Sequence, residues 1–167
     1  MNRHRAWAAG FGFPYPLSIL LPILLFLSPP MSNTPIRLAV VDDHILFRKG
    51  LHALLSGFAG MEVLFEAGDG EELLEHFDQG LVPDVVLMDL QMPNLDGLQT
   101  TRLLRAQYPH VRVIIISMHD EPDLIESLRA EGAHGYLLKN ADPEQVQSAI
   151  RTVMRNGNEA SSQVLYK

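Results

Sequence analysis

The sequence predicts an α/β domain in which helices cover both faces of a doubly wound parallel sheet. Five apolar segments of strand length alternate with five segments whose apolar residues recur at helical spacing, and together they occupy residues 36–155. Such alternation is typical of parallel β–α–β units. The chain of 167 residues is 47% hydrophobic and 20% charged, so it has enough apolar side chains for one buried core.

The elements can be assigned in chain order from residue types and spacing. Ile36–Val41 is an apolar, β-branched run interrupted only by Arg37, which is typical of a strand covered on both faces. The spacing of apolar residues then changes and predicts a helix over Leu46–Phe58. The remaining predicted strands are Glu62–Glu66, Asp84–Asp89, Val111–Ser117 and Gly135–Leu138, and the remaining helices are Glu71–Gln79, Leu95–Gln107, Pro122–Glu131 and Pro143–Arg155. The last helix is the most clearly marked, because Asp142 can cap it and Pro143 occupies its first turn.

Cysteine usage and charge exclude several classes of function. The chain has no cysteine, which excludes a disulfide scaffold, a thiolate zinc site and a cysteine nucleophile. The net charge is −7, and two of the 13 basic residues, Arg3 and Arg5, lie within residues 1–30, where no acidic residue occurs. The rest of the chain therefore carries 11 basic against 20 acidic residues. Because phosphate backbones attract clustered Lys and Arg, we expect no direct nucleic acid binding by this chain.

Residues 1–30 differ in composition from the rest of the chain. Arg3 and Arg5 precede the apolar run Leu17–Leu27, in the order of the basic and hydrophobic regions of a signal peptide. The run is short for a membrane-crossing helix, Pro22 interrupts it, and no small-x-small cleavage motif follows it. Two interpretations stay open, an upstream extension without a folded role and a true signal or anchor. We expect the first, with the domain starting at Met31 and no attachment to a membrane.

Polar side chains stand at the carboxyl ends of four of the five predicted strands. They are Asp42 and Asp43 after the first strand, Asp89 at the end of the third, Ser117 at the end of the fourth and Lys139 after the fifth. In an open parallel sheet, this edge forms the binding crevice. Converging carboxylates repel one another by ~4 kcal/mol per close pair at an effective dielectric near 20, so they need a cation. A hard divalent ion meets this need, and Mg²⁺ also accepts phosphate oxygens.

These groups together suit phosphoryl chemistry. A metal ion, an ammonium and a hydroxyl can hold a phosphoryl group while a carboxylate attacks it and becomes an acyl phosphate. Asp89 is the candidate nucleophile, because it is the only acid that ends a strand alone. Taken singly, each group has an ordinary interpretation as a helix start, a solvated lysine or a backbone-bonded hydroxyl. His44 and His119 have no partner at metal-ligand spacing and are interpreted as loop or capping residues, which also argues against zinc.

Four segments resemble the motifs of a known family. In chain order they read VVDDH, VVLMDLQMPNLDG, IIISMHD and GYLLKN. Their order and spacing resemble those of the response-regulator receiver domain of two-component signalling, over Ile36 to about Gly157. The closest similarity is to the receivers of LuxR/NarL-type transcriptional response regulators. The resemblance implies the flavodoxin-like, CheY-like (βα)5 fold with strand order 2-1-3-4-5, which the pattern alone does not fix.

The resemblance also implies roles for individual residues. Asp89 matches the phosphoacceptor, and Mg²⁺ is expected on Asp42, Asp43, Asp89 and the backbone carbonyl of Gln91. The residues expected to bind the phosphoryl group are Ser117 and Lys139, and those expected to form the switch are Ser117 and Tyr136. Pro93 and Gly97 are expected to shape the loop after the phosphoacceptor.

The predicted function is that of a phosphorylation-dependent receiver in a two-component phosphorelay. We expect residues 31–157 to form the receiver and residues 158–167 to begin a linker, with the output domain absent from the chain. The expected partner is a sensor histidine kinase, a homodimer is a further expectation, and the expected location is the cytoplasm. The chain is expected to be a signalling module rather than an enzyme.

Three alternatives remain beside this prediction. The first is the regulatory receiver of a truncated LuxR-type DNA-binding transcription regulator. The second is a Mg²⁺-dependent phosphatase of doubly wound fold, which would need a second acid where Gln91 stands. The third is a membrane-tethered interaction domain, for which residues 1–30 are the only support.

Overall fold

The five predicted strands pair in parallel in one sheet with the order β2-β1-β3-β4-β5, as predicted. The computed structural model describes residues 34–155, so the predictions for residues 1–30 and 158–167 lie outside the described residues. The strands are β1 (Ile36–Val41), β2 (Met61–Ala67), β3 (Val85–Asp89), β4 (Arg112–Ser117) and β5 (Gly135–Leu138), and the helices are α2 (Ile45–Ser56), α3 (Gly70–Asp78), α4 (Gly97–Gln107), α5 (Pro122–Ala130) and α6 (Pro143–Arg155).

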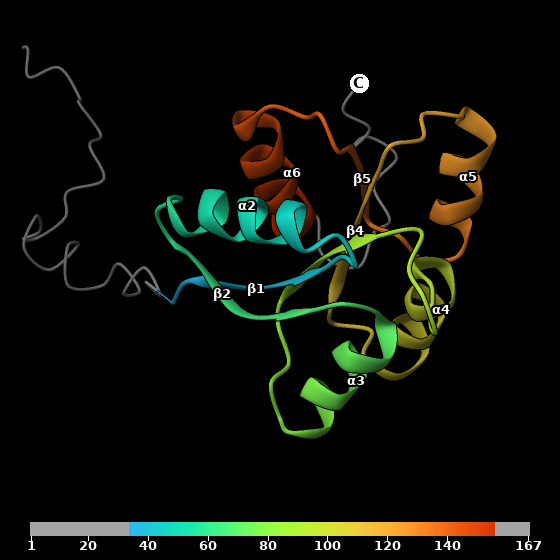
Figure 1. The fold of residues 1–167 in the computed structure, drawn as a ribbon, viewed down its shortest axis with the longest axis horizontal. Helices are drawn as coiled ribbons and strands as arrows, with labels where there is room; N and C mark the ends of the chain where they lie inside the picture. Colours follow the sequence, from blue (N-terminus) through green and yellow to red (C-terminus); the bar gives the residue numbers. More distant parts are fainter. Residues whose placement is uncertain (1–33, 156–167) are drawn as a thin grey trace, which may run out of the picture. The chain divides into compact units, whose positions relative to one another are not determined.

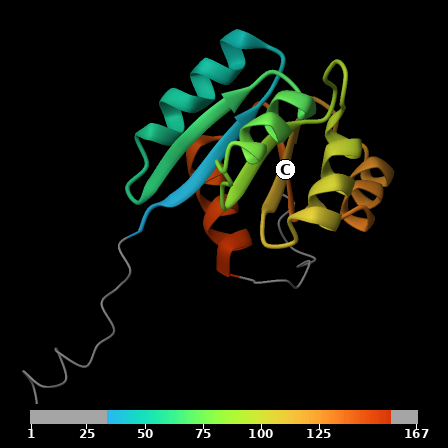
Figure 2. The same ribbon diagram turned by 90° about the horizontal axis from the view of Figure 1, so that it is seen from below.

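The sheet separates two apolar cores. Side chains alternate along each strand, so Leu38 and Val40 of β1 face one core while Ala39 and Val41 face the other. Helices α2 and α6 cover the first core, and α3, α4 and α5 cover the second. Figure 1 shows α2 and α6 together on one side of the sheet, and in Figure 2 α2 runs beside β1 and β2. Within residues 34–155, no helix is long and apolar enough to cross a membrane.

The observed element boundaries agree with the predicted ones to within two residues, and two of the differences have clear causes. Leu95 lies in the loop before α4 rather than in the helix, because Asp96 caps the helix: its side chain accepts from the backbone N–H of Gln99, whose own side chain accepts in return. Asp84 precedes β3 rather than belonging to it, and its carboxylate accepts a hydrogen bond of 2.8 Å from the backbone N–H of Arg37.

The order of the strands determines where a site can form. β1 and β3 are neighbours in the sheet, and the chain leaves them toward opposite faces, into α2 after β1 and into α4 after β3. The carboxyl ends of β1 and β3 therefore flank the switch point where ligands bind in open α/β sheets.

Candidate functional site

The acidic pair that follows β1 has one buried and one exposed member. Asp42 is 2% exposed, and the side chain of Asp43 is 37% exposed. A carboxylate oxygen of Asp42 accepts a hydrogen bond of 2.8 Å from the backbone N–H of His44, and the guanidinium of Arg48 donates to its backbone carbonyl. Arg48 of α2 also donates a hydrogen bond to the carboxylate of Glu66 in β2. It therefore links the segment after β1 to the neighbouring strand.

Asp89 is the last residue of β3 and is 5% exposed. Its Oδ1 accepts a hydrogen bond of 2.8 Å from the backbone N–H of Leu90, and its Oδ2 accepts one of 2.9 Å from the ammonium of Lys139. Burial raises the pKa of Asp89, and Asp42 adds to the rise, while the contact with Lys139 opposes it. Asp89 is therefore a buried acid whose charge depends on neighbouring cations.

The loop after Asp89 is folded back on it. The backbone N–H of Gly97 donates to the carbonyl of Leu90 at 2.9 Å, and a Cβ on Gly97 would lie 2.3 Å from the carbonyl oxygen of Asp89. Only glycine fits this approach without displacing the backbone that carries Asp89. Gln91 and Pro93 are exposed in this loop.

Lys139 joins the two buried acids. Its ammonium nitrogen lies 2.8 Å from Asp42 Oδ2 and 2.9 Å from Asp89 Oδ2. The first contact is an ion pair without the alignment of a hydrogen bond, so Asp42 Oδ2 is a buried oxygen with no hydrogen-bond partner. Burial alone would lower the pKa of Lys139, but the two carboxylates outweigh it and raise that pKa. Lys139 is therefore a firmly charged ammonium.

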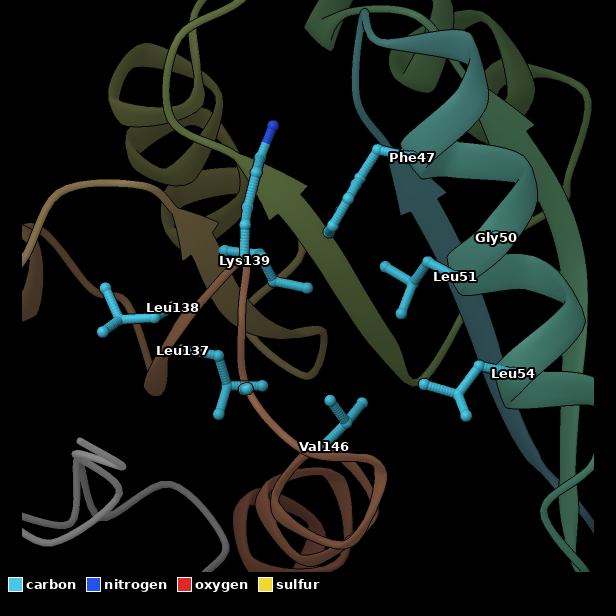
Figure 3. Close-up of a pocket in the computed structure, with 10 residues that line it drawn as sticks. Phe47, Gly50, Leu51, Leu54, Leu137, Leu138, Lys139 and Val146 are labelled. Carbon is cyan, nitrogen blue, oxygen red and sulfur yellow. The ribbon is translucent and has the colours of Figure 1, made fainter.

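A pocket of about 260 Å³ lies beside Lys139, between α2 and the segment from β5 to α6. Figure 3 shows the stem of Lys139 next to the ring of Phe47, with Leu51 and Leu137 among the walls. The ammonium lies 4.8 Å from the centre of the Phe47 ring, a distance suited to a cation–π contact. The apolar walls restrict the solvation of Lys139 on that side and favour its contacts with the acids.

Ser117 and Tyr136 meet near the end of β4. Ser117 is 2% exposed, and its hydroxyl accepts a hydrogen bond of 3.2 Å from the backbone N–H of His119. Tyr136 is 4% exposed with its ring in the core under α4 and α5, and its hydroxyl donates to the backbone carbonyl of His119. Burial raises the pKa of Tyr136. The switch residues predicted from the sequence are therefore close to one another.

His44 corrects one expectation from the sequence. It does begin α2 as a capping residue, but its side chain makes no capping hydrogen bond. Its Nδ1 lies 3.0 Å from Asp43 Oδ1 and 3.3 Å from Asp42 Oδ1, and 3.9 Å from Asp89 Oδ2. These contacts with the carboxylates were not predicted from the sequence, and the place of His44 directly after the acidic pair was the available signal.

The charge balance of the site fits a divalent cation. One donor atom from each of Asp42, Asp43, His44 and Asp89 lies within 4.8 Å of the others. Asp42 and Asp89 share the single ammonium of Lys139, and Asp43 adds a third carboxylate to the same cluster, so negative charge exceeds the positive charge of the lysine. Carboxylate oxygens are the ligands that hard divalent ions prefer.

Comparisons with known proteins agree on one family. Residues 38–151 match the family described as the response regulator receiver domain. The chain is 36% identical over 130 residues to transcriptional regulatory protein DegU of Brevibacillus brevis, a match that covers 76% of this chain and 53% of that protein. It is 40% identical over 135 residues to transcriptional regulatory protein MctR of Rhizobium johnstonii, covering 80% of this chain and 63% of that protein. The matched part is thus about half to two thirds of the length of these curated relatives.

Solved structures support the same relationship. The signal receiver domain of the response regulator NarL from Mycobacterium tuberculosis has a TM-score of 0.64 and 37% identity, covering 73% of this chain and 95% of that chain. CheY of Borrelia burgdorferi, solved in a complex with CheX, BeF3 and Mg²⁺, has a TM-score of 0.66 and 26% identity, covering 72% of this chain and 90% of that chain.

Proposed function

The chain belongs to the response regulator receiver domain family of two-component systems, and from this we propose that it is a phosphorylation-dependent receiver that accepts a phosphoryl group on Asp89 from a sensor histidine kinase. The observation that carries the proposal is the buried carboxylate of Asp89, which lies at the switch point in contact with Lys139 and beside the acidic pair. The product of the reaction is the altered receiver itself, so we assign a signalling role rather than an enzymatic one.

The residues of the site can be assigned to steps of the transfer. A carboxylate oxygen of Asp89 attacks the phosphorus atom, the bond from phosphorus to the donor imidazole nitrogen breaks, and that nitrogen keeps the electron pair. The ammonium of Lys139 and the hydroxyl of Ser117 would hold the phosphoryl oxygens, since both stand at the same edge of the sheet as Asp89. The attack needs an ionised carboxylate, which Lys139 favours against the effect of burial.

We propose Mg²⁺ as the cofactor, held by Asp42, Asp43, Asp89 and the backbone carbonyl of Gln91. Bound there, Mg²⁺ would neutralise charge on the phosphoryl oxygens. The uncompensated carboxylates support this assignment, as does the Mg²⁺ in the CheY complex described above.

The partner would approach the edge of the sheet where Asp89 lies. Three large apolar side chains at this edge are strongly exposed: Ile45 at 66% and Leu46 at 89% in the first turn of α2, and Met118 at 74% after β4. Exposed apolar groups next to a reactive site are typical of an interaction surface. We assign them to contact with the kinase domain that carries the phosphohistidine, which implies a cytoplasmic location. A homodimer stays a prediction.

Mass spectrometry with a small phosphodonor tests the phosphoacceptor. Incubation with phosphoramidate and Mg²⁺ should add one phosphoryl mass to the wild-type chain and to Asp78→Asn, in which an exposed acid of α3 is replaced. Asp89→Asn should gain no mass while keeping the wild-type circular dichroism spectrum. Full labelling of Asp89→Asn, mapped to another residue, would refute the assignment.

A second candidate has one supporting observation. The curated relatives DegU and MctR are transcriptional regulatory proteins, of which this chain covers 53% and 63%. The second candidate is thus the regulatory receiver of a LuxR-type DNA-binding regulator. A helix-turn-helix segment encoded in the surrounding coding sequence would support it.

We also propose that residues 31–157 form the receiver, so a chain starting at Met31 should keep the wild-type rate of phosphorylation.

A further inference from the structure

We propose that His44 is an additional protein ligand of the acidic site, through which the site binds divalent transition ions that accept imidazole, such as Zn²⁺, in competition with Mg²⁺. The inference rests on the proposed metal site and adds a residue that sets its metal selectivity. None of the roles proposed above involves the side chain of His44.

Distances between the donor atoms support coordination to one ion. Ligand atoms about 2.1 Å from an ion are ~3.0 Å apart at right angles and ~3.4 Å apart in a tetrahedron. His44 Nδ1 lies 3.0 Å from Asp43 Oδ1 and 3.3 Å from Asp42 Oδ1, which fall within the range that these two geometries span. Asp89 Oδ2 is farther from the same nitrogen, at 3.9 Å, and remains within the span of one coordination sphere.

The orientation of His44 is not explained by its place at the start of α2. A side chain at this position commonly accepts a hydrogen bond from the first turn of its helix, and the imidazole of His44 makes none. The imidazole is 68% exposed, so the apolar core does not hold it either. Its Nδ1 instead faces Oδ1 of Asp42 and Oδ1 of Asp43, while the buried Oδ2 of Asp42 makes no hydrogen bond and is paired with the ammonium of Lys139.

The chemistry of the donors predicts which ions gain from His44. Mg²⁺ prefers oxygen ligands and keeps several waters, so an imidazole adds little to its binding. Imidazole and carboxylate together suit Zn²⁺ and other divalent transition ions, which bind a deprotonated ring nitrogen. Because the carboxylates are shared, either ion should displace the other.

Calorimetric titration of the full chain with Zn²⁺ alone and with Mg²⁺ alone tests this assignment. His44→Asn removes the nitrogen ligand but keeps a polar residue well suited to the start of a helix. We expect the Zn²⁺ affinity of His44→Asn to fall at least about tenfold, the loss expected when a metal ligand is disturbed, and its Mg²⁺ affinity to change less than about twofold. The matched control is His119→Asn, because His119 Nδ1 contacts Glu121 at 3.6 Å instead of the acidic cluster. It should leave both affinities unchanged.

A second measurement locates the bound ion. In ¹H–¹⁵N spectra of the imidazoles, Zn²⁺ should shift Nδ1 of His44, and excess Mg²⁺ should reverse the shift. Wild-type Zn²⁺ affinity in His44→Asn, or a His44 signal that does not move at saturating Zn²⁺, would overturn the inference. These results would leave the proposed function intact, whereas wild-type Mg²⁺ affinity in Asp43→Asn would refute the proposed metal site itself.

Discussion

Replacing Asp89 by asparagine should stabilise the metal-free protein while abolishing its phosphorylation. Asparagine has the shape of the protonated acid and carries no charge. Burial is the main cause of the raised pKa of Asp89, so the folded protein favours the neutral form more than the unfolded chain does. The ionised carboxylate therefore costs folding free energy at neutral pH, and Asp89→Asn removes that cost.

The size of the effect follows from the contacts of the carboxylate. Lys139, 2.9 Å away, attracts Asp89 by ~6 kcal/mol at an effective dielectric near 20. Carboxylate oxygens of Asp42 and Asp43 lie at most 4.8 Å away, so each repels it by at least ~3.5 kcal/mol on the same scale before solvent screening of the more exposed Asp43. These repulsions offset the attraction of Lys139, so the loss of water around Asp89 decides the sign. We expect Asp89→Asn to add about 1 kcal/mol, which corresponds to a rise of about 4 °C in Tm.

The pH dependence provides an independent check. An unfolded aspartate titrates near 3.8 and the folded pKa of Asp89 is higher, so between the two values the folded state holds more protons. The free energy of unfolding should therefore fall as the pH rises through this window, and the whole loss of stability is present above the folded pKa. The advantage of Asp89→Asn should be largest at neutral pH and shrink toward acid pH.

Scanning calorimetry in EDTA at several pH values measures this difference. Asp78→Asn is the matched control and should change Tm by less than about 1 °C, because surface substitutions have small effects. Mg²⁺ should stabilise the wild type more than Asp89→Asn, since the variant lacks one carboxylate of the site. A lower Tm for Asp89→Asn than for the wild type at pH 7 in EDTA would refute the reasoning.

Three further predictions concern the surroundings of the site and the opposite edge of the sheet. Gly97→Ala would place a Cβ 2.3 Å from the carbonyl oxygen of Asp89, so we expect a loss of about 2 kcal/mol in urea unfolding and slower phosphorylation by mass spectrometry. Ser117→Ala should still accept the phosphoryl group but give a smaller change in methyl chemical shifts on addition of beryllofluoride. His134 has a pKa lowered to about 4 by burial and by Arg112, so the wild type should lose at most about 3 kcal/mol between pH 6.5 and 4, reduced by solvent screening. His134→Asn should flatten that loss in thermal melts.

The elements could be predicted from the sequence because their signals are local. Apolar runs, helical spacing and capping residues gave all ten elements to within two residues. The start of α4 was predicted two residues early, at Leu95. The sequence did hold a signal for the true start, because Asp96 and Gln99, three residues later, form a capping box. Strand order depends instead on pairing between distant segments, which residue spacing does not encode, and only the resemblance to a family supplied it.

The candidate site likewise contains some contacts that could be predicted from the sequence and others that could not. Asp42, Asp89 and Lys139 could be placed together because parallel strands end at one edge of the sheet, and the ion pairs confirm that they meet. The contact between His44 and Asp89 links positions 45 residues apart and depends on the direction of one side chain, so spacing could not reveal it. The same holds for the ring of Tyr136, whose burial depends on packing under α4 and α5.

The position of Tyr136 limits how the proposed switch can work. Its ring is buried and its hydroxyl is bonded to the backbone of His119, so moving it outward would cost roughly 2–4 kcal/mol of apolar burial and hydrogen bonding. Each charge-assisted hydrogen bond to a phosphoryl group contributes ~1.5–3 kcal/mol, a similar amount. At that cost, no more than about 3% of the molecules have the ring outward before phosphorylation, so an inward ring alone does not distinguish the two states. We therefore expect phosphorylation to act through Ser117, Lys139 and the metal ion together, and the loss of either residue should weaken the response without abolishing phosphorylation.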